Sequence, residues 1–490
     1  MDVKALTEAV SAGNVGVDQL LEIIAQQAQQ IDKLNEQIAQ LKEQLAAKSP
    51  TERLNEAYSE KAEEKRQAKR KRKKKKRHKP LRRGRLSTAE KIKLAERTEK
   101  VYPTEIPQDQ CKFSHTRVAW RLEDGRAVLI AYDIYRHRNR YGKPPGLLGR
   151  SEYGIEITLA LAYQVYCLGL SIDKACAVLS FFQQLKLSKS QADRLLTQLA
   201  RSWESEFETL CTLLANAAVV HCDETSWSIN SVWAFLNDKL TVLFYGVHKD
   251  GDTLKAILDK ETFLGTLISD DAAVYQGFSQ AQKCWAHLLR KAIKLTLRSP
   301  DESRYRVFAD SLLDLYRKAK QIAADGRFSP AGRERKVDEF EESLRALCRE
   351  RYEDKRTDGD EVEEDYRRLC NEIMRLMLAG ELFVFVTTAG VEGNNNASER
   401  QLRDDATARK TGRTSKTARG AKRRSIISSV LQSVCKQLGS FTLEGVIAEV
   451  KSWMHRGRSC FQEQAEASQL SHPERSKPLL DQLILTADPT

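Results

Sequence analysis

Apolar residues repeat every seven positions near the start of the chain. One position of the repeat is occupied by Val17, Ile24, Ile31, Ile38 and Leu45, and the other by Leu20, Gln27, Leu34 and Leu41. Isoleucine and leucine in these positions favour a parallel two-stranded coiled coil. We therefore expect segment 1–48 to form a homodimer or a higher assembly through Val17 to Leu45. The alternative is a helix that packs on its own chain, because only about four heptads are present.

A second helical pattern runs from Ser171 to Trp203 and predicts two short helices joined by a tight turn. Ser188 and Gln191 have the spacing of a capping box at the start of the second helix. The predicted apolar face comprises Ile172, Ala175, Cys176, Leu179, Phe182, Ala192, Leu195, Leu196, Leu199 and Trp203. The predicted exposed cations are Lys186, Lys189 and Arg194. The pattern fits a helix-turn-helix DNA reader or an ordinary helical hairpin equally well.

From Ala217 the pattern changes to short runs rich in β-branched and aromatic residues. The runs AAVVHCD, SVWAFLN and LTVLFYGV predict three adjacent strands. A helical stretch near Lys255 to Phe263, the apolar run GTLISD and the helical segment CWAHLLRKAIKL follow, and charged helical periodicity continues from Ser303 to Leu378. The polar tail after Arg456 is expected to be loosely ordered.

These patterns predict a multidomain α+β protein, which suits a length of 490 residues. The expected parts are a coiled coil (1–48), a basic arm (49–88), a small N-terminal domain (89–150), a helical domain (151–212), a first core part (213–295), a helical insertion (296–385), a second core part (386–456) and a polar tail (457–490).

The positive charge of the chain is local. Lys65 to Arg85 contains 15 Lys and Arg residues and no acid, which exceeds the net charge of +13 of the whole chain. Such a block is typical of a solvated arm that binds a polyanion, most often nucleic acid, or of a plain solubilising linker. Its densest part is Lys71, Arg72, Lys73, Lys74, Lys75, Lys76 and Arg77. The arm follows the coil, whereas in bZIP proteins the basic helix precedes it.

Ten scattered cysteines without a C-x-x-C pair fit reduced thiols in a cytoplasm. The longest apolar stretches are interrupted and too short to span a bilayer, so no membrane role is expected. Cys111, His115 and His137 match no standard zinc spacing, and no structural zinc is predicted there.

Three acids stand where metal-dependent phosphoryl transfer needs them. Asp223 and Asp270 end two predicted strands, and Glu399 lies on a later helix. Hard ions such as Mg²⁺ take oxygen ligands, and two ions about 4 Å apart can activate one oxygen and stabilise another. Taken singly, each acid also suits a turn or a helix cap.

The motifs around these acids resemble the insertion-sequence 66 family of bacterial transposases, members of the DDE superfamily. The resemblance rests on HCDETSW at His221 to Trp227, SDDAAVY at Ser269 to Tyr275, CWAHLLRK at Cys284 to Lys291, NNNASERQLR, and the later RGAKRRSIISSV. It runs from about Arg140 to Trp453, and the N-terminal coil is similar to the leucine zipper of that family. Asp271 stands where the family usually has glycine.

The resemblance implies a ribonuclease H-like catalytic core interrupted by an all-helical insertion, which fills the long interval between Asp270 and Glu399. If the stretch were a separate downstream domain, Glu399 would be left away from the two aspartates. The resemblance makes Asp223, Asp270 and Glu399 the catalytic acids and the ligands of two Mg²⁺ or Mn²⁺ ions. It also implies a bacterial, nucleoid-associated protein with small accessory proteins from the same element.

The expected activity is metal-dependent cleavage and strand transfer at the ends of an insertion sequence. Phosphate contacts are expected from Arg290, Lys291, Arg400, Arg403, Arg409 and Lys410. His287 is expected to pack or to face DNA and not to act as a base. The alternatives are a DNA-binding protein without catalysis and a ribonuclease H-fold nuclease that only hydrolyses.

Overall fold

The computed structural model describes residues 17–47, 86–352, 361–470 and 477–485, in two units that are treated separately, Met1–Ser87 and Thr88–Thr490. The first unit contains helix α2 (Val17–Ala47), which confirms a helix where the heptad repeat predicts one. Ile31, Leu34 and Ile38 on its apolar seam are 58, 53 and 49% exposed. The coiled coil itself stays a prediction, and the densest part of the basic arm lies outside the described residues.

The second unit begins with α5 (Thr88–Lys93) and a small sheet. Its strands are β1 (Arg97–Val101), β2 (Lys112–Glu123), β3 (Arg126–His137) and β4 (Arg140–Tyr141), and they pair in the order β1-β3-β2, with β4 on β3. Asp124 and Gly125, both at positive φ, turn the chain between β2 and β3, as an Asp-Gly hairpin requires. Near a short 3₁₀ turn, η1 (Gln108–Gln110), the Cys111 thiol donates to the Pro107 carbonyl oxygen, and His137 lies 3.0 Å from the Gln110 carbonyl oxygen. The absence of a zinc site stays a prediction.

A helical layer follows the small sheet. It comprises α6 (Ile155–Ala162), the π-helical turn η2 (Tyr163–Cys167), α7 (Ile172–Phe182), α8 (Lys189–Ser202) and α9 (Glu204–Ala215). Helices α7 and α8 confirm the predicted pair, and the capping box of Ser188 and Gln191 is formed. One predicted core position is wrong: Phe182, the last residue of α7, is 64% exposed, because its ring packs against Phe181, which is itself 80% exposed.

The central sheet has five strands in the order β7-β6-β5-β8-β9. They are β5 (Val219–Ser226), β6 (Ser231–Leu236), β7 (Thr241–Val247), β8 (Thr266–Ser269) and β9 (Ala281–Lys283), with α10 (Gly251–Ile257) and η3 (Ala273–Tyr275) in the connections. Strands β5, β6 and β7 form an antiparallel meander, and β8 and β9 run parallel to β5. All residues of β6 and β7 are buried, because β-branched and aromatic side chains fill both faces.

The edge strand β7 is covered by helix α17 (Ala418–Gln437) through a row of serines. Ser425, Ser429 and Ser433 are four residues apart, so they share one face of the helix. Their hydroxyl oxygens accept hydrogen bonds of 2.9, 2.8 and 3.0 Å from the backbone N–H groups of Tyr245, Leu243 and Thr241, respectively. The helix therefore satisfies backbone donors that a sheet edge normally leaves open.

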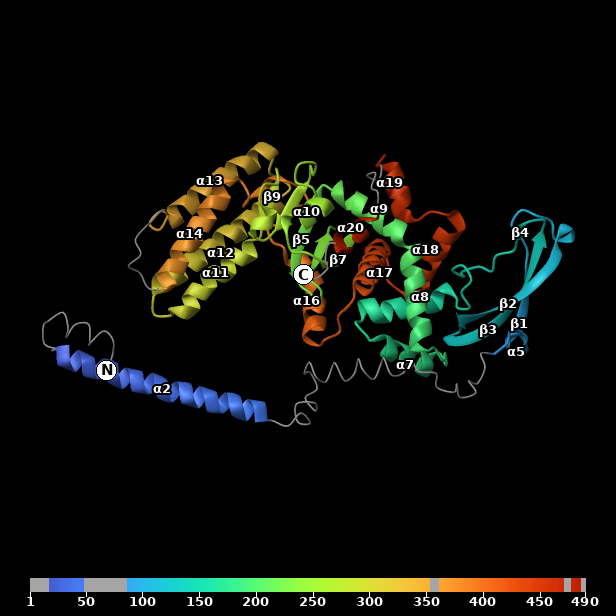
Figure 1. Ribbon diagram of the computed structural model, residues 1–490. Coiled ribbons are helices and arrows are strands. Elements are labelled where there is room, and N and C mark those ends of the chain that lie inside the picture. Colours follow the sequence, from blue (N-terminus) through green and yellow to red (C-terminus); the bar gives the residue numbers. More distant parts are fainter. Residues whose placement is uncertain (1–16, 48–85, 353–360, 471–476, 486–490) are drawn as a thin grey trace. The chain divides into compact units, whose positions relative to one another are not determined.

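A helical bundle leaves the sheet after β9. It contains α11 (Trp285–Arg298), α12 (Ser303–Ala324), α13 (Pro330–Cys348) and α14 (Glu361–Leu378) (Figure 1). Its apolar side chains form a hydrophobic cluster separate from the main core of the unit. After the bundle, the chain returns to β9 through α15 (Val384–Thr387). There the Gln282 side chain of β9 donates to the Leu382 carbonyl oxygen and accepts from the Phe385 N–H. The bundle thus ends next to its starting point, and α16 (Asn396–Lys410) can lie against β5.

The C-terminal segment corrects the expectation of a loosely ordered tail. After α18 (Leu443–Arg456), helices α19 (Cys460–Ala467) and α20 (Leu479–Leu485) pack on the core. Phe461 is fully buried against Trp453, with ring centroids 5.6 Å apart, and Leu479 and Leu480 are each 1% exposed. A few well-spaced apolar side chains are sufficient to dock these short helices. The segment is polar on average, so its overall composition does not indicate them.

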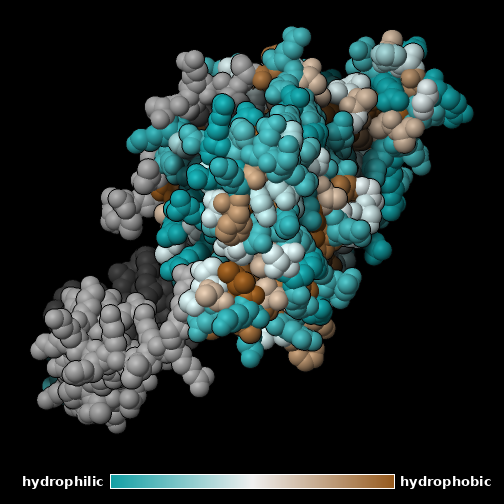
Figure 2. Space-filling model, turned by 90° about the vertical axis from the view of Figure 1, so that its right-hand side faces the viewer, coloured by the Kyte–Doolittle hydropathy of each residue, from teal (hydrophilic) through white to brown (hydrophobic). Residues whose placement is uncertain are grey.

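No helix in the described part of the chain is long and apolar enough to cross a bilayer. Figure 2 shows one side of the surface as mostly hydrophilic, interrupted by small apolar areas.

Candidate active site

Strand β5 lies in the middle of the central sheet and carries Asp223. Successive side chains of a strand point to opposite faces. Cys222 and Glu224 both contact the hydroxyl of Tyr275, so His221 and Asp223 lie on the other face, toward α16. The carboxylate of Asp223 accepts a 2.9 Å hydrogen bond from the N–H of Glu224, which fixes its position at the strand.

Asp270 follows directly after β8, the parallel neighbour of β5. The two strands pair His221 with Ile268, and extending this register by two residues places Asp270 beside Asp223. The Asp270 side chain accepts a 3.0 Å hydrogen bond from the N–H of Ala272, which closes the turn after the strand. The next acid, Asp271, forms an ion pair with Arg375 of α14, so it is held by the helical bundle.

Glu399 lies in the first turn of α16, on an element distant in sequence. Asn395, just before the helix, donates to the Cys222 carbonyl oxygen at 2.7 Å, and its Oδ1 lies 3.1 Å from His221 Nδ1. These contacts fasten the start of α16 to β5. The Glu399 carboxylate accepts from Arg290 of α11 at 2.6 Å, and His287 Nε2 is 3.7 Å from the same oxygen.

The carboxylates of Asp270 and Glu399 are close enough to Asp223 to affect its pKa. Burial, together with the nearby carboxylates of Glu224, Asp270 and Glu399, raises the pKa of Asp223 to about 7. Within the described residues, neither Asp223 nor Asp270 forms an ion pair with a cation. The site therefore gathers three partly buried carboxylates, of which only Glu399 pairs with a cation among the described residues.

Glu224 and His287 lie beside these acids and have shifted pKa values of their own. The carboxylate of Glu224 has a pKa raised by burial and lies 2.7 Å from Lys249 Nζ. Burial lowers the pKa of the His287 imidazole, and the adjacent Arg290 lowers it further. The His287 ring is thus held neutral at neutral pH.

A family model described as Transposase IS66 family matches residues 150–423, more than half of the 490 residues. The chain belongs to the IS66 family of transposases. Among curated proteins, no sequence matches it. The family resemblance drawn from the motifs is confirmed, and the matched range contains all three acids of the site.

The transposase presents several predicted phosphate-binding cations on the surface near these acids. The exposed ones on α11 and α16 are Arg290, Lys291, Arg400, Arg403, Arg409 and Lys410. Two have protein partners besides Arg290: Lys291 pairs with Glu372 at 2.5 Å, and Arg409 donates to the Ser226 carbonyl oxygen at 3.0 Å. In the helical layer, Lys186 and Arg194 are exposed, and Lys189 pairs with Asp173 at 2.7 Å.

Sequence reasoning missed three residues that shape the transposase site. Lys249, in the turn after β7, is the cation nearest to Glu224, and no local pattern indicates it. Asn395 was visible only as part of the NNNASER motif. Cys284 precedes α11 and forms a C-x-x-H motif with His287, which is a sequence signal for a site at this position.

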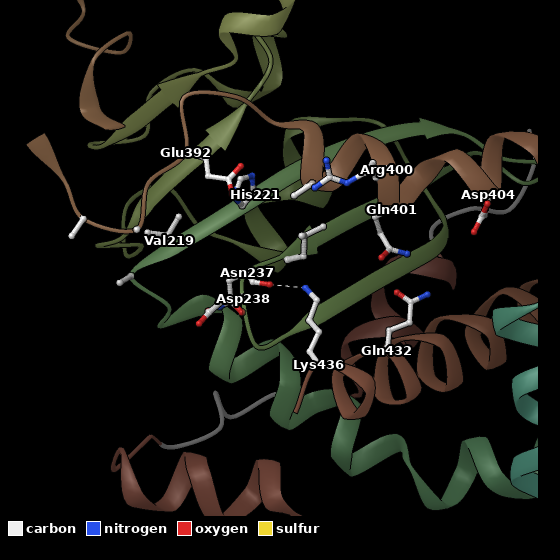
Figure 3. A pocket seen from close by; sticks show the side chains of 15 residues that line it. Val219, His221, Asn237, Asp238, Glu392, Arg400, Gln401, Asp404, Gln432 and Lys436 are labelled. Atoms are coloured by element: carbon white, nitrogen blue, oxygen red, sulfur yellow. Dashed lines mark hydrogen bonds between the residues drawn. The ribbon is translucent and has the colours of Figure 1, made fainter. Parts of the chain in front are cut away.

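A polar pocket of about 820 Å³ is lined by residues of β5, α16 and α17. Figure 3 shows Gln401 of α16 and Gln432 of α17 directed toward one another across it, with Lys436 below. Lys436 donates to the Asn237 and Leu240 carbonyl oxygens, and burial lowers its pKa to about 8. The lining residues His221 and Arg400 lie close in sequence to Asp223 and Glu399, respectively.

Proposed function

We propose that this transposase cleaves DNA strands at the ends of its element and joins the resulting 3′ hydroxyl to target DNA, with Asp223, Asp270 and Glu399 as its catalytic acids. One observation carries the proposal. Three carboxylates from β5, the end of β8 and the start of α16 gather where burial and mutual repulsion raise the pKa of Asp223 to about 7.

The donor set fits two Mg²⁺ or Mn²⁺ ions. Asp223 and Asp270 each accept one backbone hydrogen bond, so oxygen atoms remain for a cation. Buried carboxylates that repel one another are stabilised by divalent cations, and carboxylate oxygens are the ligands that Mg²⁺ prefers. The chemistry that such ions supply when bound is activation of the attacking oxygen and stabilisation of the leaving oxygen at phosphorus.

The sheet supports a ribonuclease H-like assignment of the core. Three antiparallel strands are followed by two strands parallel to the first, and that first strand, β5, is central and carries an acid. The inserted bundle returns to β9 before α16 begins, so Glu399 can serve the same site as the aspartates. Domain boundaries at about 213–295, 296–385 and 386–456 follow from this assignment.

The chain's own residues have three roles in this proposal. The acids hold the ions, Asn395 holds α16 against β5, and the exposed cations of α11 and α16 position DNA phosphates. Lys249 is 56% exposed next to Glu224, and we assign it to the same phosphate-positioning group. Phosphate contacts of this kind fix the register of DNA without reading its sequence.

Further contacts with DNA are assigned to other parts of the chain. The arm between Lys65 and Arg85 supplies affinity that falls with salt, because it displaces counterions from phosphates. The α7 and α8 pair, with Lys186, Lys189 and Arg194, binds the element ends. The seam of α2 joins two copies, and accessory proteins of the element act beside the nucleoid-associated transposase.

End-substrate assays test the proposal. With Mg²⁺ or Mn²⁺, the wild type should release cleaved ends and form strand-transfer products, while Asp223→Asn, Asp270→Asn and Glu399→Gln should bind ends and form neither product. Asp404→Asn is the matched control, since Asp404 is an exposed acid on the same helix as Glu399. Binding without any cleavage by the wild type would favour a DNA-binding protein, and cleavage without joining would favour a hydrolytic nuclease.

A further inference from the structure

A thiol, an imidazole and a carboxylate meet between the starts of α11 and α16. The ligand atoms of Cys284, His287 and Glu399 all lie within 4.8 Å of one another, and no other group of this kind occurs in the described ranges of the chain. Cys284 caps α11, so His287, three residues later, lies one turn along on the same side. The N–H of Asn395 donates to Cys284 Sγ at 3.1 Å, which ties the start of α16 to this cysteine.

The donor atoms differ from those of the aspartate pair. Sulfur, nitrogen and oxygen together are the ligands of Zn²⁺, whereas Mg²⁺ takes oxygen alone. The His287 Nδ1 atom is buried and has no hydrogen-bond partner among the described residues, so this ring nitrogen is not engaged elsewhere. Ligand atoms within 4.8 Å of one another are near the spacing that zinc bonds of about 2.0–2.3 Å require.

We propose that Cys284, His287 and Glu399 bind Zn²⁺ and that the bound zinc inhibits the transposase by withdrawing Glu399 from Asp223 and Asp270. The inhibition rests on the proposed catalytic role of Glu399, whereas the binding does not. On binding, Cys284 releases its thiol proton to solvent, and Glu399 exchanges Arg290 for the ion. Three protein ligands leave the fourth tetrahedral position to water.

Cobalt titration of the full-length protein tests the site independently of activity. Co²⁺ replaces Zn²⁺ in such sites and absorbs in the near ultraviolet when a thiolate binds it. We expect a saturable thiolate band that Zn²⁺ abolishes and that Cys284→Ser removes. Cys435→Ser is the control, because Cys435 is a partly exposed thiol of α17 outside the cluster. His287→Asn should weaken cobalt binding at least about tenfold, because loss of second-shell partners alone has that effect.

A thiolate band that persists in Cys284→Ser, or no band in the wild type, would overturn the zinc site. Inhibition is tested by adding Zn²⁺ to end-cleavage reactions in Mg²⁺, where the remaining activity of Cys284→Ser should need at least ten times more Zn²⁺ for half inhibition than the wild type. Equal sensitivity of the two proteins would overturn the inhibitory role. Absence of cleavage by the wild type would count against the proposed function, and the cobalt result would still decide the site.

Discussion

Arg290 of α11 and Glu399 of α16 form an ion pair 2.6 Å long between two elements that the helical bundle separates in sequence. Among the described residues, Glu399 is the only one of the three proposed catalytic acids that pairs with a cation. In the proposed function, a metal ion competes with this guanidinium for Glu399, and Arg290 then contacts a DNA phosphate when the ion is bound.

Arg290→Gln should therefore strengthen Mn²⁺ binding in the absence of DNA. The ion pair is largely exposed, so its contribution is about 0.2–1 kcal/mol, which corresponds to an affinity gain of up to about fivefold. Titration followed by electron paramagnetic resonance measures this affinity. Lys291→Gln is the matched control, because Lys291 is the next residue and pairs with Glu372 instead. Equal or weaker Mn²⁺ binding by Arg290→Gln would contradict the proposed competition.

Asp223→Asn should stabilise the metal-free protein at pH 8. The folded-state pKa of Asp223 is about 7 against 3.8 for a free side chain, so the folded protein binds the extra proton between these values. Stability from this group is then present at low pH and lost as pH rises through about 7. At about 1.4 kcal/mol per pKa unit, the gain at pH 8 is about 2–4 kcal/mol and should vanish near pH 4.

Urea unfolding in the presence of a chelator at the two pH values measures this difference. Asp404→Asn, which changes an exposed carboxylate, should show no comparable gain at pH 8. If Asp223→Asn were less stable than the wild type at pH 8, the repulsive carboxylate cluster would be absent.

Ser429→Ala should destabilise the central sheet, because it leaves the buried N–H of Leu243 without its acceptor. An unsatisfied buried donor costs about 1–3 kcal/mol. The adjacent Ser428 is 1% exposed, and its hydroxyl has no partner among the described residues, so Ser428→Ala should be neutral or stabilising. Chemical unfolding compares the two variants, and an equal loss in both would show that the serine row does not hold the edge of β7.

Leu34→Glu should shift the protein toward monomer. Leu34 is 53% exposed on the seam of α2, where a second helix would bury it, and a carboxylate there would lose its hydration. Lys33→Glu introduces the same group at the neighbouring position, away from the seam, and should leave the mass unchanged. Sedimentation measures the mass of both variants. Equal masses for Leu34→Glu and Lys33→Glu would exclude the coiled-coil dimer.

Local patterns were sufficient for part of this fold. The runs of β-branched and aromatic residues indicated β5, β6 and β7, and the spacing of Ser188 and Gln191 indicated the start of α8. The grouping of Asp223 and Asp270 followed from strand ends. Glu399 could be added only through family resemblance, because its place depends on how the bundle returns to β9.

Other features depend on contacts between distant segments and have no local signature. In the sequence, the serines of α17 have the pattern of exposed helix positions, and only the fold shows that they bind the backbone of β7. Phe182 has the spacing of a core residue, but its ring contacts the exposed Phe181 at the end of α7. Cys284 and His287 carry a recognisable spacing, but their nearness to Glu399 follows only from the packing of α11 against α16.

The central claim is that Asp223, Asp270 and Glu399 form one divalent-metal site, and iron-directed cleavage of the polypeptide tests it most directly. With added hydrogen peroxide and ascorbate, Fe²⁺ that occupies an Mg²⁺ site is oxidised to Fe³⁺ as peroxide is split into hydroxide and a hydroxyl radical, and the radicals cut the backbone beside the metal ligands. We predict cuts near all three acids, suppressed by excess Mg²⁺ and lost together in Asp223→Asn, while Asp404→Asn keeps the wild-type pattern. Cuts confined to one segment, or a pattern that Asp223→Asn leaves unchanged, would contradict the shared site.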